Sequence, residues 1–168
     1  MRQNRHYHYY VEGEDDRKVV NTLKTDMQKI IPGKVEKFNV VENLLSKAHI
    51  MNLKKGTTVV LIFDTDTGKV DILYKNIDFL RKQKIVKEVI CITQVMNLED
   101  ELVRSCQFRN IKELTRSRSD KDFKRDVLKI SNLKQRLDIC GFDFEKFWSE
   151  QPGNEYRQIA NDAQKVKL

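Results

Sequence analysis

Apolar and polar positions in the first half of the chain follow two alternating patterns. Residues 6–11 are mostly aromatic and β-favouring, which predicts a strand, and residues 14–31 then place apolar side chains at helical spacing. Residues 57–63, TTVVLIF, form a continuous apolar run that is typical of a parallel strand buried on both faces. Because the two patterns alternate with short connections, we expect an α/β fold with right-handed crossovers.

This alternation predicts a mostly parallel four-stranded sheet flanked by helices. Beyond Met96 the strand pattern fades and short helical patterns replace it. We therefore expect a Rossmann-like core in residues 1–115 and a helical C-terminal section in residues 116–168, which packs on the core and frays after Pro152. The other expected strands are 35–40 and 87–94, and the other expected helices are 41–55, 70–83, 97–106, 120–130, 133–139 and 142–148.

The charge of the chain narrows the choice of partner. There are 32 basic and 25 acidic residues, and the net charge of +7 favours an anionic partner, with nucleic acid as the first candidate. Many small proteins are basic for solubility alone, and the charge by itself does not distinguish a nucleic-acid-binding protein from such a protein.

Cysteine spacing and the lack of long apolar runs favour the cytoplasm. Cys91, Cys106 and Cys140 are isolated, without the paired spacing of a zinc site or a disulfide framework. The N-terminus has no apolar segment of signal-peptide length, and no run approaches the roughly 18 apolar residues of a membrane span. We therefore expect a cytoplasmic protein with no membrane partner.

Acidic residues follow two of the expected strands. Glu12 ends the first strand within EGEDD, and Asp64 and Asp66 follow the apolar run within DTDTG. Ligands of open parallel sheets bind at the carboxyl ends of the strands, so these carboxylates should meet at one edge if the two strands are neighbours. Asp64 and Asp66 would point the same way if the strand continued through both. Crowded carboxylates repel one another, and proteins usually tolerate them by binding a hard divalent cation between them. Mg²⁺ is the first candidate for this cation.

The two acidic motifs together resemble the TOPRIM domain, the catalytic module shared by topoisomerases, primases and several nucleases. In that domain a glutamate, commonly followed by glycine, ends the first strand, and an Asp-x-Asp motif follows a later hydrophobic strand. VEGEDD and LIFDTD match this pattern in order, spacing and strand context over residues 6–115. The resemblance implies a TOPRIM-like fold, with Glu12 as general acid or base and Asp64 and Asp66 as Mg²⁺ ligands.

The motif pattern is most similar to the nuclease branch of the overcoming-lysogenization-defect family. There the first motif is Glu-x-x-x-Asp, which Glu12 and Asp16 supply as metal-associated carboxylates. An acidic motif after the following strand implies Glu99 as a further metal ligand, and a later lysine implies Lys121 or Lys124, of which we assign the catalytic role to Lys121. The implied reaction is hydrolysis of phosphodiester bonds in DNA or RNA by metal-activated water, with Mg²⁺, or Mn²⁺ as second option.

Basic residues cluster in the segment TRSRSDKDFKR. Arg116, Arg118, Lys124 and Arg125 are expected to contact the phosphates of nucleic acid without reading its sequence. A solvated helix face is the ordinary alternative for this segment.

The acidic motifs also have ordinary alternatives. The residues of DTDTG are typical of a solvent-exposed turn, and the acidic residues after Glu12 are typical of the first turn of a helix. Asn97 is a helix cap candidate for a helix whose first turn contains Glu99. These alternatives stay open at the level of the sequence.

The chain lacks parts that accompany the TOPRIM domain elsewhere. It has no G-x-x-x-x-G-K-[ST] phosphate loop, so an ATPase would have to be a separately encoded partner, and it has no room for topoisomerase or primase domains. We expect a small stand-alone TOPRIM nuclease; the alternative is a non-catalytic nucleic-acid-binding or regulatory module that acts with such a partner. A phosphotransfer enzyme is a third option, although DTDTG lacks the usual Asp-x-Asp-x-Thr context.

Overall fold

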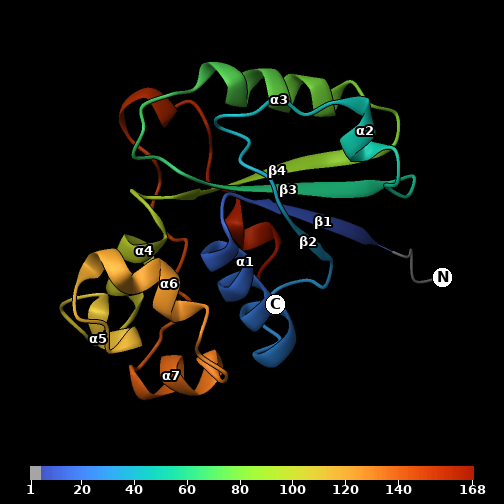
Figure 1. The fold of residues 1–168 in the computed structure, drawn as a ribbon. Coiled ribbons are helices and arrows are strands. Elements are labelled where there is room, and N and C mark those ends of the chain that lie inside the picture. The colour runs from blue at the N-terminus through green and yellow to red at the C-terminus, as the bar shows by residue number, and fades with distance from the viewer. Residues whose placement is uncertain (1–4) are drawn as a thin grey trace.

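The computed structural model describes residues 5–168, and its centre is a parallel sheet. The strands are β1 (His6–Val11), β2 (Lys34–Lys37), β3 (Thr57–Asp64) and β4 (Val86–Gln94). Within the described residues they form one four-stranded sheet in the order β2-β1-β3-β4, and each neighbouring pair runs parallel (Figure 1). The expected α/β, Rossmann-like architecture is confirmed.

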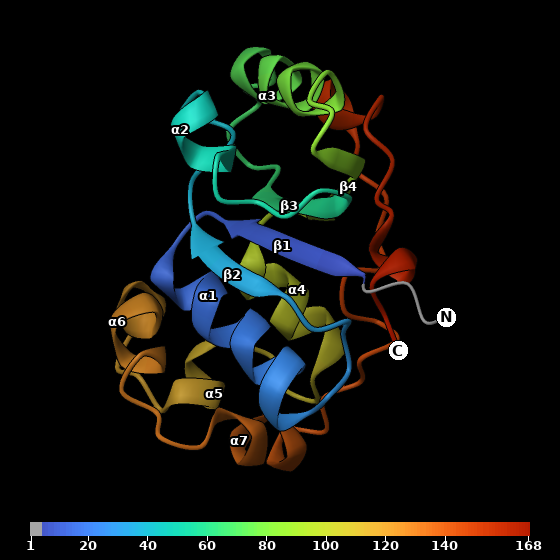
Figure 2. The ribbon, with the colours of Figure 1, turned by 90° about the vertical axis from the view of Figure 1, so that its right-hand side faces the viewer.

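Helices cover both faces of this sheet. The α-helices are α1 (Glu14–Asn21), α2 (Lys47–Ile50), α3 (Asp71–Arg81), α4 (Leu98–Ser105), α5 (Lys112–Thr115), α6 (Phe123–Val127) and α7 (Leu133–Ile139). Shorter helical segments are η1 (Thr22–Asp26), η2 (Asp120–Asp122), η3 (Asn154–Tyr156) and η4 (Ala163–Lys165). Figures 1 and 2 show α2 and α3 on one face and α1 with α4 to α7 on the other. Along residues 5–168, no helix combines the length and the apolar character needed to cross a bilayer.

Strand β3 lies in the middle of two hydrophobic clusters. All 8 of its residues are buried. Val60 and Ile62 belong to the cluster on the α1 face, whereas Leu61 and Phe63 belong to the cluster on the α3 face. Alternate side chains of one strand therefore fill two cores, which is the physical reason for its continuous apolar run.

The C-terminal segment crosses from one face of the sheet to the other along the outer side of β4 (Figure 2). Tyr156 is buried in the cluster on the α3 face, and Val166 is buried in the cluster on the α1 face. Between them the Asp162 N–H donates to the Cys91 carbonyl of β4 over 2.9 Å. The expected fraying after Pro152 is wrong, because this segment is packed and covers the edge of the sheet.

The long helix expected at 41–55 is also wrong, since only the four residues of α2 are helical there. The Asn39 side chain accepts hydrogen bonds from the backbone N–H groups of Val41 and Glu42. The fully buried Asn76 side chain of α3 then bonds backbone groups of the same loop. Side chains thus satisfy the backbone that a helix would otherwise have satisfied.

Three other expected helices differ from the structure. The one expected at 120–130 divides into η2 and α6 and ends at Val127. The one expected at 14–31 divides into α1 and the π-helical η1 and ends at Asp26, and Ile30 instead forms an isolated bridge with Lys167. Residues 142–148 form no helix: residues 144–148 lie in turns, and Trp148 adopts a left-handed backbone conformation with φ of 57°.

Candidate active site at the carboxyl edge of the sheet

The acidic residues of the two motifs come together because β1 and β3 are neighbours. Glu12 follows the last residue of β1, and Asp64 is the last residue of β3. The Asp64 backbone N–H donates to Glu12 Oε1 over 3.3 Å. The convergence expected from the strand order is therefore observed at the carboxyl edge.

A third carboxylate comes from the first turn of α1. Asp16 accepts a hydrogen bond at Oδ2 from the Gly13 N–H over 3.0 Å, so this side chain caps the helix. Its other oxygen, Oδ1, accepts from Gln94 Nε2 over 2.9 Å, and Asp64 Oδ1 accepts from the same nitrogen over 2.8 Å. We refer to Glu12, Asp16 and Asp64 as the carboxylate cluster.

Glycine at position 13 leaves room for the side chains of the first turn of α1. A Cβ atom placed there would lie 2.6 Å from Asp15 Oδ1, which is closer than van der Waals contact allows. The glycine after Glu12 therefore lets Asp15 and Asp16 fold back toward the strand end.

Burial and mutual repulsion perturb the carboxylate cluster. Burial first, and the charge of Asp16 second, raise the pKa of Glu12 to about 7. For Asp16, burial and then Asp15 raise the pKa to about 6. For Asp64, burial and then Glu12 and Asp16 raise the pKa to about 9, so without a cation this carboxyl is protonated at neutral pH.

Asp66 stands apart from the cluster. Strand β3 ends at Asp64, and the Thr65 N–H bonds the carbonyls of Gln94 and Met96, so the strand does not continue through Asp66. The condition for a shared direction of Asp64 and Asp66 is therefore not met. Asp66 is exposed, yet its charge contributes to the raised pKa of both Glu12 and Asp64.

Glu99 belongs to a second acidic group, the outer group, formed with Asp15. Burial raises the pKa of Glu99, with Lys124 opposing the rise and Asp15 adding to it. Asp15 lies in the first turn of α1, as expected for the acidic residues after Glu12, but it is only 6% exposed and is therefore not a surface charge. Asn97 does cap α4, as its Oδ1 accepts from the Asp100 N–H over 3.0 Å.

Lys124 of α6 is the cation that acts on both acidic groups. Burial lowers the pKa of Lys124, but the charges of Asp15, Glu99, Asp64 and Asp16 outweigh it, and the pKa is raised overall. Lys121 is exposed in η2, and no hydrogen bond or ion pair within residues 5–168 joins it to these carboxylates. The structure thus brings Lys124, rather than Lys121, to the site.

The other basic residues of this segment are dispersed. Arg125 forms ion pairs with Asp122 over 3.3 Å and Asp126 over 3.0 Å, so acidic neighbours already compensate its charge. Arg118 is exposed in the turn before η2. Arg116 lines a hollow of about 470 Å³ beside α6, the α6 hollow, whose other basic residues are Lys129 and Arg136.

Sequence reasoning missed Gln94 and Trp148. Gln94 is only 1% exposed at the end of β4, and its Oε1 accepts from Trp148 Nε1 over 3.2 Å. A polar residue that ends an apolar strand beside the two acidic motifs was the available signal for Gln94. No local pattern indicates Trp148, because it reaches the site from the far end of the chain.

The hydrogen bonds leave few carboxylate oxygens available to a cation. Both oxygens of Asp16 accept hydrogen bonds, whereas Glu12 Oε2 and Asp64 Oδ2 have no partner among the described residues. Over the same part of the chain, no three His, Cys, Asp or Glu side chains are arranged to hold a metal ion together. The donor set therefore suits a hydrated cation that one or two carboxylates hold, which is the usual mode for Mg²⁺.

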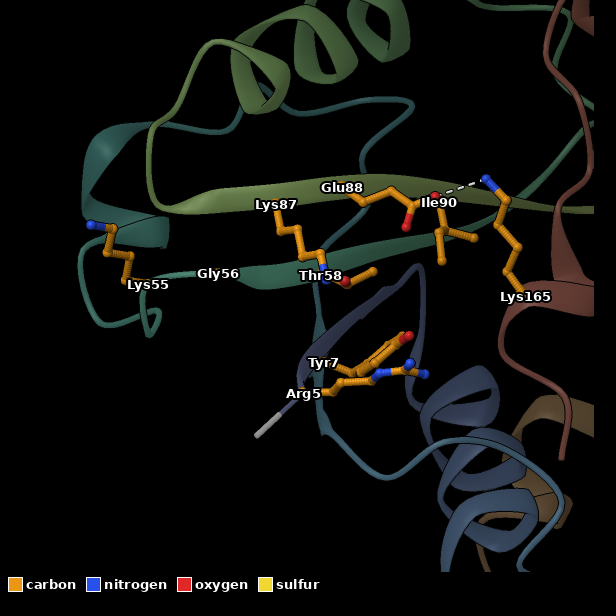
Figure 3. Close-up of a pocket in the computed structure, with 9 residues that line it drawn as sticks. All are labelled: Arg5, Tyr7, Lys55, Gly56, Thr58, Lys87, Glu88, Ile90 and Lys165. Atoms are coloured by element: carbon orange, nitrogen blue, oxygen red, sulfur yellow. Dashed lines mark hydrogen bonds and ion pairs between the residues drawn. The ribbon is translucent and has the colours of Figure 1, made fainter. Parts of the chain in front are cut away.

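A separate basic hollow lies at the opposite, amino end of the strands. It has a volume of about 630 Å³, and Figure 3 shows Lys165 joined to Glu88 on one side of it. None of the acidic residues of the candidate site lines it. Its lining residues are Arg5, Tyr7, Lys55, Gly56, Thr58, Lys87, Glu88, Ile90 and Lys165.

No protein-family model, curated protein or solved structure matches this chain. The functional inference therefore rests on the residues of the site.

Proposed function

We propose that the chain is a metal-dependent nuclease of the TOPRIM type that hydrolyses phosphodiester bonds of DNA or RNA. The carboxylate cluster supports this proposal most strongly. Three carboxylates with raised pKa values meet at the carboxyl edge of a parallel sheet, and the hydrogen bonds of Gln94 offset their repulsion only in part, so protons or a cation would relieve it further.

Glu12 and Asp64 are the residues best placed to hold Mg²⁺ or Mn²⁺, because each keeps one oxygen without a hydrogen bond to the described residues. When bound, the cation would lower the pKa of its water and neutralise charge on the phosphate. Asp66, which is exposed and stands apart from the cluster, would act on the cation through its charge. Asp16, whose oxygens are both engaged, would act on the cation mainly through its charge.

Two further side chains supply proton transfer and charge. Glu12, with a pKa of about 7, can accept or donate a proton near neutral pH. Lys124 can offset the negative charge that develops on a phosphate near the site, a role first assigned to Lys121. Asp15 and Glu99 of the outer group, whose charges also act on Lys124, would provide the carboxylates for a second cation.

One observation favours the second candidate, a non-catalytic module. Gln94 Nε2 bridges Asp16 and Asp64, so hydrogen bonds alone hold these carboxyl groups in place. A site stabilised in this way can bind nucleic acid or regulate a partner, such as a separately encoded ATPase, without cleaving a substrate.

Cleavage assays with three variants test the proposal. Purified protein is incubated with plasmid DNA or structured RNA in Mg²⁺ or Mn²⁺, alongside Glu12→Gln, Asp64→Asn and the control Asp26→Asn. We expect the first two to lose activity by roughly 10²–10⁴-fold, the range for removal of a catalytic acid or base. The control changes an exposed carboxylate of η1 and should stay active.

Two outcomes count against the nuclease. Full cleavage by folded Asp64→Asn and Glu12→Gln would exclude the assigned site. Salt-dependent binding of nucleic acid without cleavage in either metal would favour the non-catalytic module.

A further inference from the structure

A chain of buried hydrogen bonds joins the C-terminal section to the carboxylate cluster. Glu101 Oε2 of α4 accepts from the Trp148 backbone N–H over 2.9 Å. The Trp148 indole Nε1–H donates to Gln94 Oε1, and Gln94 Nε2 donates to both Asp16 and Asp64. Glu101, Trp148 and Gln94 are each at most 1% exposed, so water does not compete for these bonds.

The chemistry of the partners fixes the orientation of the Gln94 amide. An indole N–H can only donate, so the amide oxygen has to face Trp148. The two amide hydrogens then face Asp16 and Asp64, and each carboxylate receives one. A flipped amide would place its oxygen against two carboxylates and leave the indole without an acceptor.

Trp148 is held in a conformation that a bulky residue rarely adopts. Its φ of 57° lies in the left-handed region, and such strain persists only where the surroundings enforce it. Glu101 accepts its N–H, and Asn161 Nδ2 donates to its carbonyl over 3.0 Å. The strained backbone of Trp148 thus occurs at the residue whose indole N–H contacts Gln94 in the candidate site.

Glu101 also fixes the strand end that carries Gln94. Its Oε1 accepts from the Val95 N–H over 3.0 Å and from Arg104 over 2.7 Å. One buried carboxylate therefore holds both the residue after Gln94 and the backbone of Trp148, so the amide and its indole partner keep a fixed relative position.

We propose that Trp148 is a positioning residue, whose indole N–H locks the Gln94 amide so that Asp64 stays oriented to hold a cation and the charge of Asp16 stays beside it. The effect on cation binding rests on the proposed function, since the cation belongs to that site. The hydrogen-bond lock itself can be measured without any metal. By this means the C-terminal section completes a site whose carboxylates all come from the first 64 residues of the chain.

The alternative is that Trp148 only fills space, next to Phe147 at a ring-centroid distance of 4.7 Å. Trp148→Phe keeps an aromatic ring but removes the donor. Phe147→Leu disturbs the packing beside Trp148 but keeps the donor, and it is the matched control.

The first measurement is amide proton exchange by NMR in metal-free protein. Trp148 is the only tryptophan, so its indole signal needs no further assignment. We expect the Gln94 side-chain protons to exchange slowly in the wild type and in Phe147→Leu, and at least about 10-fold faster in Trp148→Phe, since that variant frees the amide to rotate. Equal protection of the Gln94 protons in Trp148→Phe and the wild type would overturn the proposal.

The second measurement is a Mg²⁺ titration of the same proteins by calorimetry. We expect Trp148→Phe to bind Mg²⁺ roughly 10–100-fold more weakly, the usual effect of removing a group that orients a metal ligand, while Phe147→Leu binds as the wild type does. Unchanged affinity in folded Trp148→Phe would overturn the positioning role. Absence of Mg²⁺ binding and cleavage in the wild type would instead contradict the proposed function, and the exchange data would still decide whether the lock exists.

Discussion

At the scale of single residues, ionisation of Asp64 lowers the free energy of unfolding as the pH rises. Its pKa rises from an ordinary value of 3.8 to about 9 on folding, so the folded protein holds a proton that the unfolded chain releases. This contribution to stability is fully present below about pH 4 and is lost as the pH rises toward 9.

We therefore predict that Asp64→Asn flattens the pH dependence of stability. In EDTA, the wild type should lose stability between pH 5 and pH 9. The variant should lose less, because only the raised pKa values of Glu12 and Asp16 remain, and it gains roughly 1–3 kcal/mol over the wild type at the upper end. Thermal unfolding at several pH values measures the difference. Asp26→Asn serves as the control and should follow the wild type; a parallel loss in Asp64→Asn would show that Asp64 is not the group responsible.

The sequence predicted the residues of the cluster but not those that orient them. Glu12 and Asp64 were accessible because each directly follows an expected strand, and parallel strands share their carboxyl edge. The first-turn position of Asp15 was predicted but its burial was not, since a helix-capping pattern does not show which acidic residue will be buried. Trp148 could not be predicted, because its position depends on long-range packing and on a hydrogen bond to Glu101 rather than on local periodicity.

At the scale of elements, α4 carries two glutamates with separate roles. Glu101 is fully buried and accepts bonds from Arg104 and from two backbone N–H groups, whereas Glu99 takes part in the outer group beside Lys124. Glu101 is therefore expected to matter for stability, and Glu99 for the proposed site.

We predict opposite effects for Glu101→Ala and Glu99→Ala. Removing Glu101 leaves its buried partners unpaired and should cost roughly 3–5 kcal/mol, which is the range for breaking a buried ion pair. For a chain of this size, the melting temperature would fall by about 2–4 °C per kcal/mol. Glu99→Ala should change stability by less than about 0.5 kcal/mol but weaken metal-dependent cleavage. A Glu99→Ala variant that melts as early as Glu101→Ala would contradict this division.

Elements were predictable where burial alone decides them. The run that forms β3 and the amphipathic pattern of α3 came out within a few residues of the observed bounds, because both depend on which faces are buried. The helix expected at 41–55 failed because the distant Asn76 side chain satisfies that backbone, and the end of the chain is ordered because Tyr156 and Val166 are buried on opposite faces of the sheet.

At the scale of the whole molecule, positive charge gathers in two hollows. The basic hollow lies at the amino ends of the strands, away from the carboxylate cluster. The α6 hollow lies beside the helix that carries Lys124, whose charge acts on the cluster. A nucleic acid that presents a phosphate to the cluster is therefore expected to run over the α6 hollow.

We predict that a matched pair of double variants separates the two surfaces. Each double variant removes two positive charges, so general attraction to nucleic acid falls equally in both. The first is Arg116→Gln with Lys129→Gln, and the second is Lys55→Gln with Lys87→Gln. If phosphates lie in the α6 hollow, only the first pair should also reduce the slope of log K against log salt, by about 1 for each lost contact. Binding measured by fluorescence anisotropy at several salt concentrations gives the slope. A larger reduction of the slope in Lys55→Gln with Lys87→Gln would place the nucleic acid at the amino ends of the strands instead.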